Sequence, residues 1–207
     1  MNCTGKTKQW LMRAGLLVVV TLACTQAALA HSGTDAALGV RSGFLHPLTG
    51  LDHLVAMVAV GLWGAQLGNP AIWVLPITFP LVMAMGGLLG IVGVPLPLSE
   101  QAIALSGIAL GTLIAFGARA PLAVAMLLVG LFAIFHGYAH GRGLPQAADP
   151  LAYAAGFVVA TGMLHLCGIL IGLVIRWPMG AQAVRACGAA IGLVGVYFLL
   201  AAWGTIG

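Results

Sequence analysis

Six long apolar segments joined by short connections constrain the fold of this chain more than any other feature. We place them at residues 45–67, 71–94, 100–117, 121–140, 150–175 and 184–204. Each approaches the roughly 20 residues that an α-helix needs to cross a bilayer. Only 6% of the 207 residues are charged, against about 25% in a soluble domain. The sequence therefore predicts an all-α integral membrane protein, a bundle of six transmembrane helices embedded in the lipid bilayer.

Glycines spaced four residues apart recur along these segments. Small residues at this spacing let two helix backbones approach closely in lipid. The pairs are Gly64/Gly68, Gly86/Gly90, Gly107/Gly111, Gly168/Gly172 and Gly188/Gly192. Four of the five connections contain Gly, Pro or Asn, and their short length suits turns between antiparallel neighbours. We expect one compact transmembrane domain over residues 31–207.

The first 30 residues have the pattern of a cleavable signal peptide. Lys6, Lys8 and Arg13 precede a short apolar stretch at 16–23, and Ala28-Leu29-Ala30 resembles a cleavage site. The apolar stretch is short for a membrane span. Two alternatives remain, an uncleaved first helix and a lipoprotein cut before Cys24. After cleavage we expect a short polar tail over residues 31–43.

A cleaved signal peptide predicts the orientation of the bundle in the bacterial inner membrane. It places the mature N-terminus on the periplasmic side, and six spans return the C-terminus to that side. Arg119, Arg176 and Arg185 then lie in inner connections, with Arg41 and Arg142 outside. This distribution agrees with the positive-inside rule.

Charge and cysteine content exclude several classes of function. The net charge of +4 is no sign of nucleic-acid binding, because three of the eight basic residues belong to the signal peptide. The cysteines, at positions 3, 24, 167 and 187, form no CxxC pair. The sequence therefore offers neither a zinc knuckle nor a thioredoxin-like motif.

The rare polar residues gather near one predicted face of the membrane. Ionisable groups within membrane segments are costly, so they indicate a functional site. The candidates in the outer parts of the first, third and fourth segments are His46, Asp52, His53, Glu100, His136 and His140. His46 and His53 share a helix face if the chain is helical from Pro47 onward, and His136 and His140 share one at a spacing of four. We expect these side chains to meet in one outward-facing pocket.

Imidazoles combined with carboxylates are typical ligands of a divalent transition metal such as Ni, Co, Zn or Cu. No cysteine lies in the cluster, which argues against Cu(I) and structural zinc, and the histidines disfavour Mg and Ca. Asp52 has the alternative role of orienting a histidine. Met57 and His165 lie deeper along the segments, either as packing residues or as part of an inward route.

Two motifs resemble those of the HupE/UreJ family. His46-Pro-Leu-Thr-Gly-Leu-Asp52-His53 is similar to that family's His-x5-Asp-His signature, and Phe135-His136-Gly137-Tyr138-Ala139-His140-Gly141 to its second motif. The start of the third segment, Leu98-Ser99-Glu100-Gln101, is also similar. The resemblance covers essentially the whole chain. It implies import of nickel, or in some members cobalt, across the bacterial inner membrane for hydrogenase or urease assembly, with His46, Asp52, His53, Glu100 and His136 as functional residues and His140 beside them.

The second motif departs from the family at one position. Many members have a glutamate two residues after its last glycine, where this chain has Gly143 preceded by Arg142. The missing carboxylate bears on metal selectivity and affinity.

The resulting hypothesis is a metal permease and not an enzyme. Nickel or cobalt is its cargo, no resident cofactor is expected, and a metallochaperone or a second copy of the chain is a possible partner. The main alternative is a redox membrane protein with a haem bound between two histidines. A third, an intramembrane protease using Ser106, lacks the first glycine of a Gly-x-Ser-Gly site.

Overall fold

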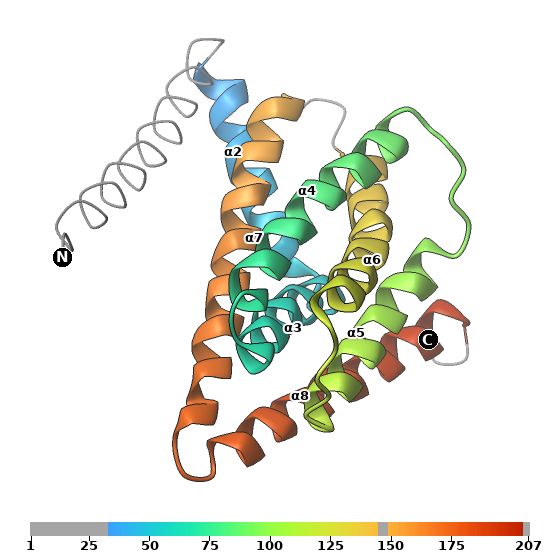
Figure 1. Cartoon of the computed structure of the whole chain (residues 1–207). Coiled ribbons are helices and arrows are strands. Elements are labelled where there is room, and N and C mark those ends of the chain that lie inside the picture. Colours follow the sequence, from blue (N-terminus) through green and yellow to red (C-terminus); the bar gives the residue numbers. More distant parts are fainter. Residues whose placement is uncertain (1–32, 145–148, 205–207) are drawn as a thin grey trace, which may run out of the picture.

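The computed structural model describes residues 33–144 and 149–204. The expected signal peptide at 1–30 lies outside the described residues. Within them, all regular structure is helical (Figure 1). The helices are α2 (Gly33–Thr49), α3 (Leu51–Leu67), α4 (Ala71–Ile91), α5 (Ser99–Ala115), α6 (Leu122–Arg142), α7 (Pro150–Leu173), the short 3-10 helix η1 (Val174–Arg176) and α8 (Gly180–Ala202). The prediction of an all-α protein is confirmed.

Four helices are long and apolar enough to cross a membrane by themselves. They are α4, α6, α7 continued through η1 to Arg176, and α8. The bent pair α2 and α3 supplies a fifth span if the two helices count as one. The remaining apolar helix, α5, has only 17 residues. The described chain thus has four to five candidate spans, and the sixth expected span corresponds to this shorter helix.

The first apolar segment, expected as one span over residues 45–67, is bent. An 83° bend separates Ala37–Thr49 from Leu51–Leu67. Gly50, between them, has extended backbone angles and caps the start of α3. Most of the stretch expected as a short polar tail, residues 31–43, is helical, because α2 already begins at Gly33. His46 and His53 therefore belong to two different helices and share no helix face.

The helices pack as close pairs through glycine. Helix α4 packs along α6, α5 along α8, and both α2 and α3 along α7 (Figure 1). A methyl group added at Gly86 would meet the main-chain oxygen of Ile134, and one added at Gly168 would meet that of Val58. The predicted role of the glycine pairs is confirmed at such positions. Gly68 is different, because it ends α3 with a φ of 81° and a methyl group added to it would meet no atom within 4 Å.

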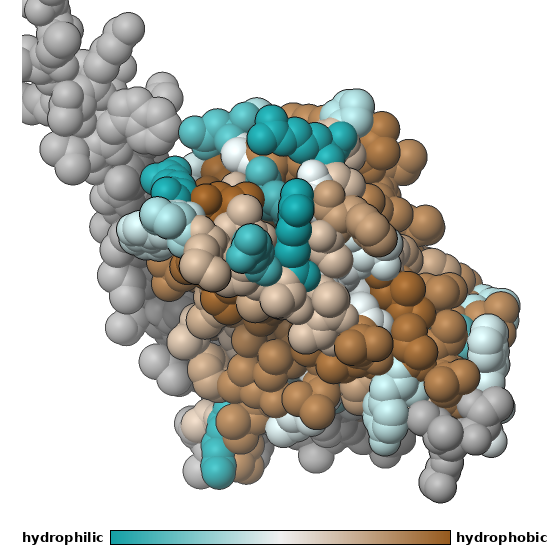
Figure 2. Space-filling view, turned by 90° about the horizontal axis from the view of Figure 1, so that it is seen from below, coloured by the Kyte–Doolittle hydropathy of each residue, from teal (hydrophilic) through white to brown (hydrophobic). Residues whose placement is uncertain are grey.

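Large apolar side chains lie on both the inside and the outside of the bundle. Trp63, Phe79 and Leu110 are fully buried in the core, whereas Leu127 and Leu166 are exposed. Figure 2 shows one end-on view in which most hydrophilic residues gather in one part and broad hydrophobic areas cover the rest. An apolar exterior of this kind matches a hydrocarbon environment. The fold is therefore that of a multi-pass membrane protein.

Candidate metal centre

The start of α3 positions the Asp52–His53 pair. The main-chain N–H of His53 donates to Oδ1 of Asp52 at 2.9 Å, and Nδ1 of His53 lies 2.8 Å from the same oxygen. A carboxylate oxygen only accepts, so Nδ1 carries the proton and Nε2 has a free lone pair. A Cβ at position 50 would lie 3.0 Å from Oδ1 of Asp52. Gly50 therefore leaves room for the pair.

Four imidazoles from three helices meet beside this pair. The ring centre of His53, on α3, lies 5.3 Å from the ring centre of His136 and 4.6 Å from that of His140, both on α6. The ring of His46, on α2, lies 4.8 Å from that of His140. His140 is thus the member that connects the two halves of the bent first segment. The structure thus places the four histidines singled out in the sequence beside one another.

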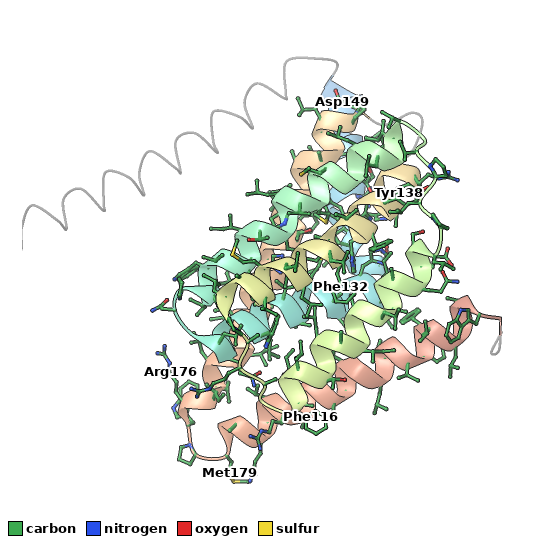
Figure 3. The ribbon with its side chains drawn as sticks, turned by 45° about the vertical axis from the view of Figure 1, so that its right-hand side comes forward. Phe116, Phe132, Tyr138, Asp149, Arg176 and Met179 are labelled. Atoms are coloured by element: carbon green, nitrogen blue, oxygen red, sulfur yellow. The ribbon has the colours of Figure 1, made fainter. Side chains whose placement is uncertain are left out.

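The helical spacing of α6 puts His136 and His140 on one face, one turn apart. Nδ1 of His136 lies 2.9 Å from the main-chain oxygen of Phe132. Figure 3 labels Phe132, whose side chain is half-buried. A carbonyl only accepts, so Nδ1 of His136 is the protonated nitrogen and its Nε2 is free. Both histidines are buried, at 0% and 6% exposure.

Several ring nitrogens of this cluster are buried without a hydrogen-bond partner. They are Nε2 of His53, Nε2 of His136 and both ring nitrogens of His140. A buried polar atom without a partner costs about 1–3 kcal/mol, so such atoms need an explanation. Because lone pairs on imidazole nitrogens are metal ligands, a bound cation would satisfy the unprotonated nitrogens, one on each of these three histidines.

The donors do not yet converge on a single point. Among the described residues, no group of three or more His, Cys, Asp or Glu side chains has the arrangement of a metal site. The rings instead pack against each other at angles of 56° to 82°. Side-chain rotation within the cluster would be required to bring three nitrogens onto one ion. Histidine and aspartate are ligand types that fit a divalent transition metal, and the structure shows the four histidine rings in contact.

Glu100 lies apart from the four histidines. It occupies the first turn of α5, as expected, and is exposed. Within the described chain, no hydrogen bond or ion pair joins it to the cluster. Asp149 is also separate, because its side chain caps α7 by accepting from the main-chain N–H groups of Leu151 and Ala152.

Two aromatic residues of α7 line the cluster without having been singled out in the sequence. The ring of Phe157 lies 4.3 Å from that of His140, and the ring of Tyr153 lies 5.9 Å from that of His46. These two residues are four apart and so share one face of α7, which is the feature of the sequence that could have identified them. Tyr153, Phe157 and His140 also border a largely apolar cavity of about 460 Å³ between α4, α6 and α7.

Gly143 lies directly beside His46. A Cβ at this position would be 4.0 Å from Cε1 of His46. The φ of Gly143 is −85°, which any residue adopts. A longer side chain here would therefore start close to the cluster. The position where many family members have glutamate and this chain has glycine thus lies at the candidate site itself.

The haem and protease alternatives find no support in this geometry. The rings of His53, His136 and His140 pack directly on each other, which leaves no space for a porphyrin between them. The hydroxyl of Ser106 donates to the main-chain oxygen of Ile103 at 2.6 Å. Serine bonded to its own helix in this way is a common structural feature of membrane helices.

Comparisons with known proteins match nearly the whole chain. The family model described as HupE / UreJ protein matches residues 18–198. Protein HupE of Rhizobium leguminosarum bv. viciae is 43% identical over 182 residues, which cover 88% of this chain and 95% of that protein. No solved structure matches.

Proposed function

The chain belongs to the HupE / UreJ family, and from this premise we propose that it imports a divalent transition metal across the bacterial inner membrane. Nickel is the expected cargo, and cobalt is the second candidate. The imported ion would supply the maturation of a hydrogenase or a urease. Such a protein is a permease and catalyses no covalent chemistry.

The observation that carries this proposal is the cluster of four contacting imidazoles in an otherwise apolar bundle. The free nitrogens of His53, His136 and His140 are the ligand candidates, and His46 adds a fourth ring against His140. Imidazole ligands suit nickel and cobalt. They also bind less firmly than thiolates, and a transport site must release its ion as well as select it.

Asp52 is assigned the role of orienting His53. By holding Nδ1–H, it fixes the tautomer in which Nε2 faces away from the carboxylate and is available to the metal. Glu100, exposed at the start of α5, is proposed to attract the hydrated cation at the entrance before the imidazoles replace its water molecules.

The arrangement of the helices supports the proposed orientation. Figure 3 places Asp149 at one end of the bundle and Phe116, Arg176 and Met179 at the other. Arg119 and Arg176 lie in or beside the connections at the latter end, and Arg185 lies near the start of α8; the positive-inside rule assigns such residues to the cytoplasm. The bent pair, α4, α5, α6, α7 and α8 would then form six membrane segments with both termini of the mature protein in the periplasm. A cytoplasmic metallochaperone would receive the ion.

Uptake of radioactive Ni²⁺ by cells that lack their own nickel importers tests this function. The intact chain is compared with His53→Ala at matched levels in the membrane. Accumulation that depends on the intact chain and disappears in the variant is expected. Equal accumulation in both strains would remove His53 from the site. If the intact chain accumulates neither nickel nor cobalt, import of these metals is refuted.

A further inference from the structure

A second group of polar atoms lies in the core, separate from the four-histidine cluster. His165 of α7 is 1% exposed, and Met57 of α3 and Thr161 of α7 are completely buried. Nδ1 of His165 lies 2.8 Å from the main-chain oxygen of Met57. The hydroxyl of Thr161 donates to the sulfur of the same methionine at 3.5 Å. One residue of α3 thus meets two polar side chains of α7.

The hydrogen bond of His165 determines which of its nitrogens is free. The carbonyl of Met57 only accepts, so Nδ1 of His165 carries the proton and Nε2 has a lone pair. Nε2 is buried and, among the described residues, has no hydrogen-bond partner. Fixing of one imidazole nitrogen by a main-chain carbonyl, with the other left as a donor to metal, is the usual state of a metal-binding histidine.

Phe79 contacts both this histidine and one histidine of the outer cluster. The centre of its ring lies 5.4 Å from that of His165 and 5.4 Å from that of His136. Phe79 belongs to α4 and is 1% exposed. Two buried imidazoles with free Nε2 atoms therefore pack against the same aromatic side chain.

We propose that Nε2 of His165 forms an inner metal-binding position that receives the ion from the outer histidines. The proposal deepens the proposed function and rests on it. An imidazole suits a borderline divalent ion. A neutral ligand without a carboxylate beside it holds such an ion weakly, as is required of an intermediate position along a transport path.

The decisive variant is His165→Asn. The asparagine amide nitrogen occupies roughly the position of Nδ1 and preserves the hydrogen bond to Met57, whereas the ligand Nε2 is removed. The control is Gly162→Ala on the same helix, because a Cβ at Gly162 has no neighbour within 4 Å. The concentration dependence of Ni²⁺ uptake is measured for both variants at matched membrane levels.

In His165→Asn we expect the maximal uptake rate to fall about tenfold or more with an unchanged KM, because initial capture takes place at the outer cluster. Gly162→Ala should transport like the original chain. A wild-type maximal rate in His165→Asn would overturn the proposal. So would a raised KM at an unchanged maximal rate, since that result would assign His165 to initial capture.

A binding measurement separates this proposal from import itself. In purified full-length protein carrying isotope-labelled histidine, the His165 imidazole signal is identified by its loss in His165→Asn. Paramagnetic Ni²⁺ should broaden that signal. Broadening in a protein that does not accumulate nickel in cells would refute import and retain the inner site. A sharp, unshifted signal at saturating Ni²⁺ would refute the inner site even if uptake is normal.

Discussion

His136 and His165 face the same aromatic ring from two different helices, and the centre of each imidazole lies 5.4 Å from the centre of Phe79. Each of the two histidines also has its Nδ1 within hydrogen-bond distance of a main-chain oxygen, that of Phe132 and that of Met57 respectively. The two rings are therefore held in the same tautomer, with Nε2 as the free nitrogen. Through their common contact with Phe79, His136 of the outer cluster is linked to His165 in the interior of the bundle.

Asp52→Asn should weaken metal capture without loss of the protein. The amide no longer provides the charged acceptor that holds Nδ1–H of His53. Loss of such an orienting partner typically costs 10–100-fold in metal affinity, so we expect the KM for Ni²⁺ uptake to rise by about that range. Asp149→Asn is the control, because asparagine caps a helix about as well as aspartate. Equal KM values for the two variants would contradict the role given to Asp52.

Glu100→Gln should reduce uptake less than His53→Ala. The carboxylate of Glu100 is exposed, whereas His53 contacts two other imidazoles. An attraction between exposed charges is screened by salt, so the deficit of the variant should shrink as ionic strength rises. Uptake rates at low and high salt measure this. A complete, salt-independent loss in Glu100→Gln would show that this carboxylate binds the ion directly.

Gly143→Glu should strengthen metal capture. The new side chain would start 4.0 Å from Cε1 of His46, and its carboxylate would add a negatively charged ligand to a set of neutral imidazoles. We expect a lower KM for Ni²⁺ uptake in Gly143→Glu. Gly143→Gln has the same length without the charge and should not share the gain. An identical KM in Gly143→Glu and the original chain would place the new carboxylate outside the site.

Gly86→Ala should destabilise the pairing of α4 with α6, whereas Gly87→Ala should not. A Cβ at Gly86 would overlap the main-chain oxygen of Ile134, but at Gly87 the nearest atom, the oxygen of Gly137, is 3.6 Å away. Overpacking of this kind costs about 1–3 kcal/mol. Thermal unfolding of the purified variants in detergent compares them directly. Equal melting temperatures would show that the helices separate without cost at this contact.

Recognition of the site from sequence succeeded where local spacing was sufficient. His136 and His140 lie four residues apart in one uninterrupted helix, so their common face follows from helical periodicity. The same argument failed for His46 and His53, because the chain bends by 83° between them. Their rings nevertheless both reach His140. The cluster therefore forms through the bend and through contacts between helices, and not through a shared helix face.

The sequence by itself determined the class of structure and the family, and it named imidazoles and carboxylates as the candidate metal ligands. Long apolar segments with few charges exclude a water-exposed surface, and imidazoles with carboxylates restrict the chemistry. Only the tertiary structure decided which side chains meet. It brought four histidines of three helices into contact, placed Glu100 outside that group, and set Phe79 against both His136 and His165. These relationships depend on glycine-mediated contacts between helices distant in sequence, such as Gly61 of α3 against the main chain of His165, and no local pattern specifies them.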